Sequence, residues 1–411
     1  MAAALLRTIR ADATALQDDL VQLRRTLHAS PELGLDLPRT QEHVLTALQG
    51  LPLEVRTGAD TTSVVAVLRG GAAHSTAQPG EPPTVLLRGD MDALPVVEET
   101  GEEFASTNGA MHACGHDLHT TALVGAARLL AQHRDQLAGD VVFMFQPGEE
   151  GFDGAGVMLR EGVLEAAGRR VDHAFGLHVF STLLPTGLFV SKPGPMLSAS
   201  HGLHVTVRGA GGHGSTPNLA RDPITAAADM ITSLQTMITR TFDIFDPVVL
   251  SVGMIAGGTA RNVIPDTASF EATVRRFSEV NAERLRAGIG RVLDGVAAAH
   301  DVAVDWEFTG EYPLTVNDAE QTAFAADVIR ELVGEERYME LERPFSGSED
   351  FSRVLDAVPG AFVGLGACPP DLDPLQAPMN HSPRAQFADS VLGDAAAVYA
   401  GLAVQRLAVQ P

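Results

Sequence analysis

The segment from Met111 to His119 holds the densest group of side chains able to bind a metal ion. One thiolate and several imidazoles so close in sequence suit a borderline-soft divalent ion. A structural zinc finger is disfavoured, because Cys368 is the only other cysteine and no second Cys pair exists at structural spacing. A cysteine nucleophile with a histidine base is a less favoured alternative, because Cys114 and His116 are only two positions apart. The groups concerned are His112, Cys114, His116, Asp117 and His119.

Two adjacent carboxylates, Glu149 and Glu150, follow the apolar run Val141–Phe145 in the segment Gln-Pro-Gly-Glu-Glu-Gly. Paired carboxylates in a loop are often only solvated, but these two close a buried strand, where a charge is costly without a partner. Neighbouring side chains in an extended segment point apart. One glutamate is therefore able to bind a metal ion while the other faces an attacking water as general base.

Three further residues suit the surroundings of such a site. Asp92 follows the apolar run Val85–Leu87 in the segment Gly-Asp-Met-Asp-Ala-Leu-Pro. A carboxylate there would fix the tautomer of a ligating histidine, and the alternative is a turn-forming aspartate before Pro95. His178 and His381 are isolated histidines, and neither is informative alone.

The elements that must position these residues alternate between strands and helices. The runs Val64–Leu68, Val85–Leu87 and Val141–Phe145 are continuously apolar, which suits strands covered on both faces. Leu118–Leu130 has the apolar spacing of a helix. This alternation predicts an α/β fold with a mostly parallel sheet. Ligand sites in such sheets lie beyond the carboxyl ends of the strands, where the aspartates and the paired glutamates stand.

The pattern changes after Pro185, and residues 187–308 follow the order β-α-β-β-α-β. This is the order of a ferredoxin-like α+β layer, with helices on one side of an antiparallel sheet. Residues 187–308 are therefore predicted to be an inserted second domain. Residues 1–186 and 309–411 then form one discontinuous domain that carries the candidate metal ligands.

Composition excludes several classes of protein. The chain has 411 residues, a length typical of two or three domains, and a formal net charge of −23. Such an acidic chain repels phosphate backbones, so neither nucleic acid nor an anionic membrane is an expected partner. No apolar stretch is long enough to span a membrane, and two cysteines provide no disulfide framework. The prediction is a soluble, cytoplasmic protein.

The chain also resembles a known family, the N-acyl-amino-acid amidohydrolases of the two-metal aminoacylase and carboxypeptidase superfamily. The resemblance rests on motifs in family order from about residue 20 onward: Arg24-Arg-Thr-Leu-His28-Ala-Ser-Pro-Glu-Leu-Gly34, Gly-Asp-Met-Asp-Ala-Leu-Pro, Met-His-Ala-Cys-Gly-His-Asp, Pro-Gly-Glu-Glu, Gly-Leu-His178 and Asn-His381-Ser. It implies an α/β catalytic domain interrupted by a smaller lid that also mediates homodimer formation, with higher oligomers left open.

The resemblance further implies a site with two divalent metal ions per subunit, and Mn, Zn and Co all suit the mixed donor set. Glu149 matches the catalytic base, and Asp92 is expected to support it. The metal ligands implied are Cys114, His116, Glu150, His178 and His381.

The resemblance also assigns residues of the lid. His213 matches a histidine that polarises the substrate carbonyl, and Asn262 and Arg275 match positions that touch the substrate, arginine being suited to a carboxylate. An outward, surface-paired Arg275 is the alternative. Asn218 stands where relatives often carry histidine, and Leu118 replaces the usual glycine after Cys-Gly-His-Asp. These two departures leave the acyl and amino-acid preference open.

The activity implied is metal-dependent hydrolysis of the amide bond of a small N-acyl amino acid, with Glu149 as general base. A dipeptidase or carboxypeptidase on the same scaffold would differ only in the group on the acyl side. The Cys-Gly-His-Asp motif, in place of an Asp-containing one, argues for the acyl-amino-acid branch. A non-catalytic metal-binding or ligand-binding protein is the remaining alternative, and in such a protein Glu149 would be dispensable.

Overall fold

The computed structural model describes residues 2–72 and 82–407. The chain divides into two compact units, and each is described by itself. The large unit comprises Met1–Met196, Val316–Arg343 and Asp350–Pro411, and the small unit comprises Leu197–Thr315 and Pro344–Glu349. The boundaries predicted from the sequence, 187 and 308, differ from these, because a strand at 189–191 joins the large sheet and the last strand of the small unit runs on to Tyr312.

The large unit is built on an eight-stranded sheet with the order β1-β2-β4-β3-β5-β16-β6-β15. Its four central strands, β4, β3, β5 and β16, run parallel to one another. The α/β class with a mostly parallel central sheet, predicted from the sequence, is therefore confirmed. The strands are β1 (Leu53–Thr57), β2 (Val64–Leu68), β3 (Thr84–Asp90), β4 (Asp140–Gln146), β5 (His173–Phe180), β6 (Phe189–Ser191), β15 (Tyr338–Glu340) and β16 (Gly360–Gly366).

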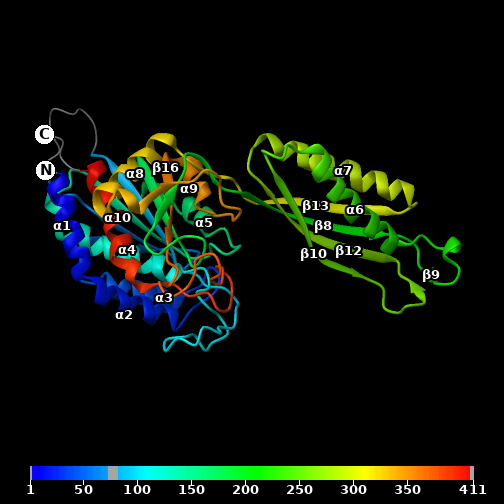
Figure 1. Cartoon of the computed structure of the whole chain (residues 1–411), viewed down its shortest axis with the longest axis horizontal. Coiled ribbons are helices and arrows are strands. Elements are labelled where there is room, and N and C mark those ends of the chain that lie inside the picture. The colour runs from blue at the N-terminus through cyan, green and yellow to red at the C-terminus, as the bar shows by residue number, and fades with distance from the viewer. Residues whose placement is uncertain (1, 73–81, 408–411) are drawn as a thin grey trace. The chain divides into compact units, whose positions relative to one another are not determined.

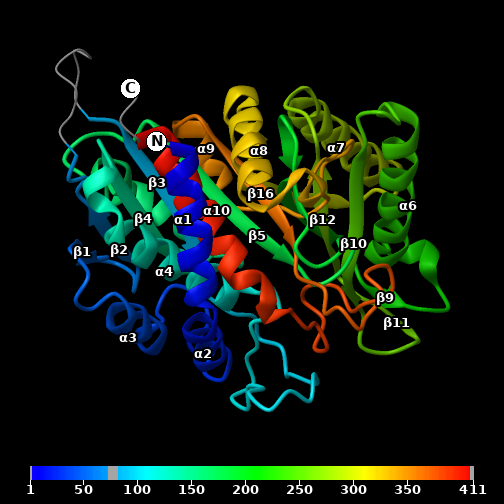
Figure 2. The ribbon, with the colours of Figure 1, turned by 60° about the vertical axis from the view of Figure 1, so that its left-hand side comes forward.

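Helices cover this sheet because its strands are apolar on both faces. Val85 and Leu87 of β3 belong to the same buried core as the inward side of α4, and Figure 2 shows α1, α4 and α10 in front of β3 and β4. The helices of the large unit are α1 (Ala2–Ala15), α2 (Gln17–His28), α3 (Pro38–Ala47), α4 (His116–Gln132), α5 (Gly154–Arg160), α8 (Ala319–Val333), α9 (Ser352–Ala357) and α10 (Leu392–Leu407). Short 3₁₀ segments lie at Arg134–Gln136, Val163–Glu165, Glu335–Arg337 and Asp389–Val391.

The small unit is a four-stranded antiparallel sheet with the order β10-β12-β8-β13 and two long helices, α6 and α7 (Figure 1). Leu203, Val205 and Val207 alternate along β8 and share a buried core with Met230 of α6 and Ile289 of α7. The chain order of these elements is β-α-β-β-α-β. They are β8 (Ala199–Arg208), α6 (Pro223–Thr241), β10 (Val248–Gly257), β12 (Thr267–Arg276), α7 (Val280–Ala299) and β13 (Ala303–Tyr312).

The remaining elements are short. The small unit also holds β9 (Gly212–His213), η3 (Pro217–Leu219) and β11 (Val263–Ile264), and β7 (Gly194–Leu197) and β14 (Thr315–Asn317) lie where the chain passes between the units. Among the described residues, no helix is both long enough and apolar enough to cross a membrane.

Candidate metal centre

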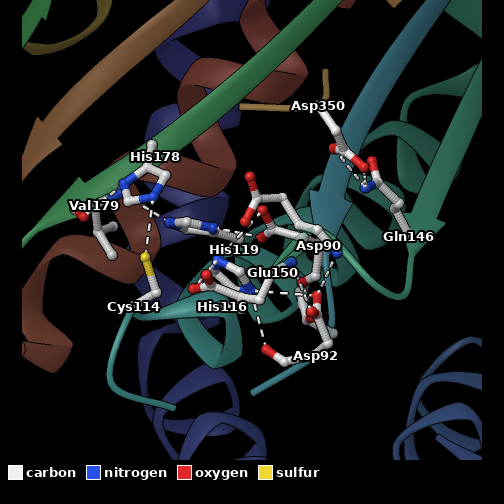
Figure 3. A network of polar contacts seen from close by, with 12 residues as sticks. Asp90, Asp92, Cys114, His116, His119, Gln146, Glu150, His178, Val179 and Asp350 are labelled. Atoms are coloured by element: carbon white, nitrogen blue, oxygen red, sulfur yellow. Dashed lines mark hydrogen bonds and ion pairs between the residues drawn. The ribbon is translucent and has the colours of Figure 1, made fainter. Parts of the chain in front are cut away.

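The candidate site lies in the large unit, at the carboxyl ends of β3, β4 and β5. These three strands are parallel and adjacent, so their carboxyl ends meet at one edge of the sheet. Asp90 ends β3, the paired glutamates follow β4, and His178 lies near the end of β5. Figure 3 shows Asp90, Glu150 and His178 converging with Cys114 and His116 from the start of α4.

The start of α4 requires a glycine. Gly115 has a φ of +87°, a left-handed conformation that other residues rarely adopt. A Cβ at this position would lie 2.4 Å from Cγ2 of Val179. The tight turn therefore brings Cys114 and His116, which flank Gly115, against the end of β5.

His116 presents one ring nitrogen to the site. Its Nδ1–H donates to the backbone carbonyl oxygen of Asp92 at 2.9 Å, so the lone pair is on Nε2. The side chain is buried, and Nε2 makes no hydrogen bond within residues 2–72 and 82–407. Burial lowers the pKa of His116, but Asp90, Asp92 and Cys114 together outweigh burial and raise that pKa well above its ordinary value, so a bound cation would take the place of the proton on Nε2.

Asp92 positions the two glutamates. Its carboxylate accepts hydrogen bonds from the backbone N–H groups of Glu149 and Glu150, each at 3.0 Å, and it is fully buried. Its Oδ1 lies 3.5 Å from Nδ1 of His116, whereas its backbone carbonyl oxygen lies at 2.9 Å. The residue therefore orients His116 through its backbone and the glutamates through its side chain.

The five expected ligands lie in one cluster, as two overlapping groups that share Cys114. Within each group the candidate ligand atoms all lie within 4.8 Å of one another. Sγ of Cys114 is 3.4 Å from Nε2 of His178, and Nε2 of His381 is 3.2 Å from Oε1 of Glu150. The first group is Cys114, His116 and His178, and the second is Cys114, Glu150 and His381.

This donor set fits divalent metal ions. One of its buried atoms, Nε2 of His116, makes no hydrogen bond among the described residues, although a buried polar atom without a partner is costly. Thiolate, imidazole and carboxylate together suit Zn, Mn or Co. Hydrogen bonds to Cys114 and Glu150 raise the pKa of His381 to about 10, and the same negative charge would attract a cation.

His119 belongs to the same sequence cluster but both of its ring nitrogens are already bonded. Nδ1 donates to Oδ1 of Asp90 at 2.6 Å, and Nε2 accepts the backbone N–H of Val179 at 2.7 Å. Burial lowers the pKa of His119, and only the neutral ring is able to accept that N–H. His119 therefore ties α4 to β5 and offers no lone pair to an ion.

The site is also supported by buried ion pairs of Arg88, which the sequence analysis did not predict. Burial raises the pKa of Asp90, but the charge of Arg88, whose Nη1 lies 2.6 Å from Oδ2, together with nearby histidines holds it well below its ordinary value. Arg88 is fully buried, and its Nη2 also lies 3.2 Å from Asp350. The sequence signal that could have predicted these ion pairs is the position of Arg88, which ends an apolar run and directly precedes Gly-Asp.

A second buried network joins α2 to α4. Nδ1 of His28 lies 2.7 Å from Oδ2 of Asp117 and Nε2 lies 3.1 Å from Oε1 of Glu98, while Nε of Arg24 lies 2.8 Å from the same Asp117 oxygen. Burial lowers the pKa of His28, but the charge and hydrogen bond of Asp117 together with the hydrogen bond to Glu98 outweigh burial and raise it to about 9. The sequence offered only the four-residue spacing of Arg24 and His28, which places both on one helix face.

The expected lid residues lie in the small unit. His213 ends β9, which pairs with β11, and the N–H of the next residue, Gly214, donates to the carbonyl oxygen of Asn262 at 2.8 Å. Nδ1 of exposed His213 accepts the N–H of Ser215 at 3.1 Å, so Nε2 of the neutral ring carries the proton. A cavity of about 580 Å³ beside this pair is lined in part by Gly214 and Val263.

Arg275 lies elsewhere in the small unit, on β12. Its Nη1 donates to Oγ of Ser200 at 2.6 Å and to Oγ1 of Thr273 at 2.5 Å. Burial lowers the pKa of its guanidinium, while nearby Glu311 raises it. The structure therefore brings His213, at the end of β9, close to Asn262, the residue before β11, and gives Arg275 partners within its own sheet.

The chain is similar to known hydrolases and peptidases over most of its length. The family model described as Peptidase family M20/M25/M40 matches residues 86–405. IAA-amino acid hydrolase ILR1-like 4 of Arabidopsis thaliana is 37% identical over 95% of this chain and 86% of its own length. Thermostable carboxypeptidase 2 of Saccharolobus solfataricus is 35% identical, over 88% of this chain and 89% of its own. The crystal structure of Bacillus subtilis YXEP protein, described as a dinuclear metal-binding peptidase of the M20 family, superposes with a TM-score of 0.79 at 31% identity, covering 96% of this chain and 99% of that one.

Proposed function

Because the chain belongs to peptidase family M20/M25/M40, we propose that it is a metal-dependent hydrolase that cleaves the amide bond of small N-acyl amino acids. The observation that carries this proposal is the convergence of Cys114, His116, Glu150, His178 and His381 in two donor groups that share Cys114, beside buried Glu149. The substrate class is supported by the similarity to an IAA-amino acid hydrolase over nearly the whole chain.

The five clustered residues would hold two divalent ions, with Cys114 near both. Such ions lower the pKa of a bound water and polarise a carbonyl group, which is the chemistry that amide hydrolysis needs. Mn, Zn and Co each fit the donor set. The similarity to a dinuclear metal-binding peptidase supports a pair of ions.

Glu149 would act as general base. Its carboxylate offers a ligand atom within 4.8 Å of those of His116 and Glu150, and its side chain is only 7% exposed. Asp92 holds its backbone, so the carboxylate is placed before substrate arrives. Glu149 would take a proton from the attacking water and deliver it to the leaving amine, the two proton transfers that hydrolysis requires.

The small unit would supply the remaining contacts. His213 would donate Nε2–H to the acyl oxygen, which gains negative charge as the water attacks. Asn262 and Arg275 would bind the amino-acid part of the substrate, and Arg275 would pair with the carboxylate of that amino acid.

We also propose that the protein forms a homodimer through the small unit, and assembly into larger homo-oligomers is left open. We further propose a cytoplasmic location. β10 is an edge strand of the small sheet and exposes Met254 and Ile255, each more than half exposed. Sedimentation of wild type beside Ile255→Lys tests the dimer. A wild-type monomer, or a variant dimer as stable as wild type, contradicts it.

The deciding experiment measures amino-acid release from N-acetyl, N-benzoyl and indole-acetyl amino acids and from dipeptides. Metal-stripped protein is tested with Mn, Zn or Co restored, beside Glu149→Gln. We expect metal-restored release from N-acyl amino acids that Glu149→Gln lowers by about 10²- to 10⁴-fold.

Matched measurements keep the result interpretable. Metal content and circular dichroism show whether Glu149→Gln is folded and loaded. Release from dipeptides alone would favour a dipeptidase or a carboxypeptidase, and the Saccharolobus relative is named as a carboxypeptidase. No release from folded, loaded wild type would favour a binding protein.

A further inference from the structure

Asn380, the residue before His381, joins three segments of the metal centre. Its Nδ2 donates to the backbone carbonyl oxygens of Cys114 at 3.1 Å and Val179 at 3.0 Å. Its Oδ1 accepts the backbone N–H and the hydroxyl of Ser181, each at 2.9 Å. The orientation of the amide is fixed, because carbonyl oxygens only accept and the backbone N–H of Ser181 only donates.

The same amide nitrogen faces the thiol. Nδ2 of Asn380 lies 3.9 Å from Sγ of Cys114, within hydrogen-bond distance for sulfur. Cys114 is the ligand that belongs to both donor groups, so its charge affects every ion held there. The two hydrogens of Nδ2 already donate to the carbonyl oxygens of Cys114 and Val179, so the sulfur shares one of them, and a shared N–H beside a thiolate still helps to stabilise its negative charge.

His381 needs such support because its backbone is strained. Its φ of +74° is a conformation that residues other than glycine rarely adopt and that persists only where surrounding contacts impose it. The N–H of His381 donates to the carbonyl oxygen of Ala113 at 2.8 Å, and Asn380 bonds to the next carbonyl along that segment, that of Cys114. Two adjacent residues of one loop are thus tied to two adjacent carbonyls of the other.

The carbonyl of Val179 connects the amide to a third ligand. It accepts Nδ1–H of His178 at 2.8 Å as well as Nδ2 of Asn380, which leaves Nε2 of His178 for a metal ion. The N–H of Val179 is bonded to His119. The backbone of one residue, Val179, therefore holds His178 in place through contacts with Asn380 and His119.

We propose that Asn380 is a positioning residue that fixes Cys114, His178 and His381 relative to one another and places a shared amide N–H beside the Cys114 thiolate. This proposal rests on the proposed metal site. Groups that orient metal ligands in this way typically contribute about 10- to 100-fold in metal affinity.

The test compares Asn380→Asp, Asn380→Ala and Ser181→Ala after loading with Co²⁺. Asn380→Asp keeps the shape and the Oδ1 acceptor but replaces the donor with an oxygen. Ser181→Ala is the matched control, because it removes a hydroxyl bonded to Oδ1 and leaves the contacts of Nδ2 intact. Competition with a chelator gives the affinity, and near-ultraviolet absorption gives the energy of the thiolate-to-cobalt charge-transfer band.

We expect Asn380→Asp and Asn380→Ala to bind Co²⁺ about 10- to 100-fold more weakly than wild type, with a displaced charge-transfer band. Ser181→Ala is expected to match wild type in both. Wild-type affinity and spectrum in both Asn380 variants would overturn the proposal. Loss of the native circular dichroism in both would also overturn it, because Asn380 would then be required for folding rather than for ligand geometry.

These readouts need no substrate. Wild type that binds two Co²⁺ ions but hydrolyses no amide would contradict the proposed function and leave the role of Asn380 standing. If wild type hydrolyses the amides but the Asn380 variants bind Co²⁺ as wild type does, the proposed function stands and the role of Asn380 is contradicted.

Discussion

At the residue scale, the site depends on which atom of each side chain is already bonded. His116 and His119 lie three positions apart on the first turn of α4, yet only His116 keeps a lone pair toward the cluster. Asp92 likewise uses its carbonyl oxygen for His116 and its carboxylate for the glutamate loop. Residue type alone does not reveal these assignments, because they are made by partners from other segments.

Asp92→Asn should weaken the site without removing any proposed ligand. The two backbone N–H groups that now meet a carboxylate would meet one amide oxygen and one N–H₂, so one of them loses its partner. We expect metal affinity and kcat/KM each to fall about 10- to 100-fold. Isothermal titration with Zn and steady-state kinetics measure the two effects. Asp60→Asn, at an exposed position, is the control, and equal behaviour of the two variants would contradict this role of Asp92.

At the element scale, the centre is made where the ends of elements meet: the carboxyl ends of β3, β4 and β5 and the N-terminus of α4. The parallel order of the strands places their ends at one edge, and Gly115 lets α4 start against β5. Buried charges then connect the helices, since Arg24 and His28 of α2 bond to Asp117 of α4.

Gly115→Ala tests the close approach of α4 and β5. Both a left-handed φ and a contact of 2.4 Å with Val179 oppose a Cβ at this position. Gly101 has a similar φ of +76°, but a Cβ added there would meet nothing within 4 Å, so Gly101→Ala isolates the cost of the backbone conformation. We expect Gly115→Ala to lose more than about 1 kcal/mol of unfolding free energy beyond Gly101→Ala. Urea unfolding measures the difference. Equal losses in the two variants would show that β5 can shift away from the added Cβ without a loss of unfolding free energy.

The network of His28 predicts a pH dependence of stability. The folded pKa of about 9 lies above the ordinary 6.5, so protonated His28 stabilises the fold. This contribution is complete below about pH 6.5 and is lost as pH rises through about 9, and a shift of this size is worth on the order of 3 kcal/mol. Unfolding free energies measured from pH 6 to 10 should fall more steeply in wild type than in His28→Gln. Parallel slopes would contradict the assignment.

At the scale of the whole molecule, one chain forms two units with different architectures. The large unit stacks helices on a mostly parallel sheet and holds all five expected metal ligands, while the small unit pairs two helices with an antiparallel sheet and holds His213, Asn262 and Arg275. The proposed function uses residues of both units.

Removal of metal should lower the stability of the large unit in particular. Ions that bind only the folded state raise its stability by mass action. After treatment with a chelator, we expect the unfolding temperature of the large unit to drop and to recover when Mn, Zn or Co is restored, while Cys114→Ala shows a smaller response. Scanning calorimetry with metal analysis measures both, and a chelator-insensitive transition from protein shown to have lost its metal would contradict the proposed ligand set.

The sequence by itself determined the class of fold and the kinds of donor atoms. Apolar runs and helical spacing are local, so β2, β3, β4 and α4 could be located from the residues alone. The aspartates and glutamates could be expected together because parallel strands end at one edge. The cysteine and histidines of 111–119 indicated a soft or borderline metal from residue type alone.

Only the tertiary structure decided how those donors are used. Val179 and Asp90 occupy both nitrogens of His119, and Asn380 joins Cys114 to a loop 266 positions away in sequence. The boundary of the small unit likewise depends on β6, which pairs with β16 from the far end of the chain. Hydrogen bonds and strand pairings between distant segments depend on where the whole chain places them, and no local pattern of residue types records that placement.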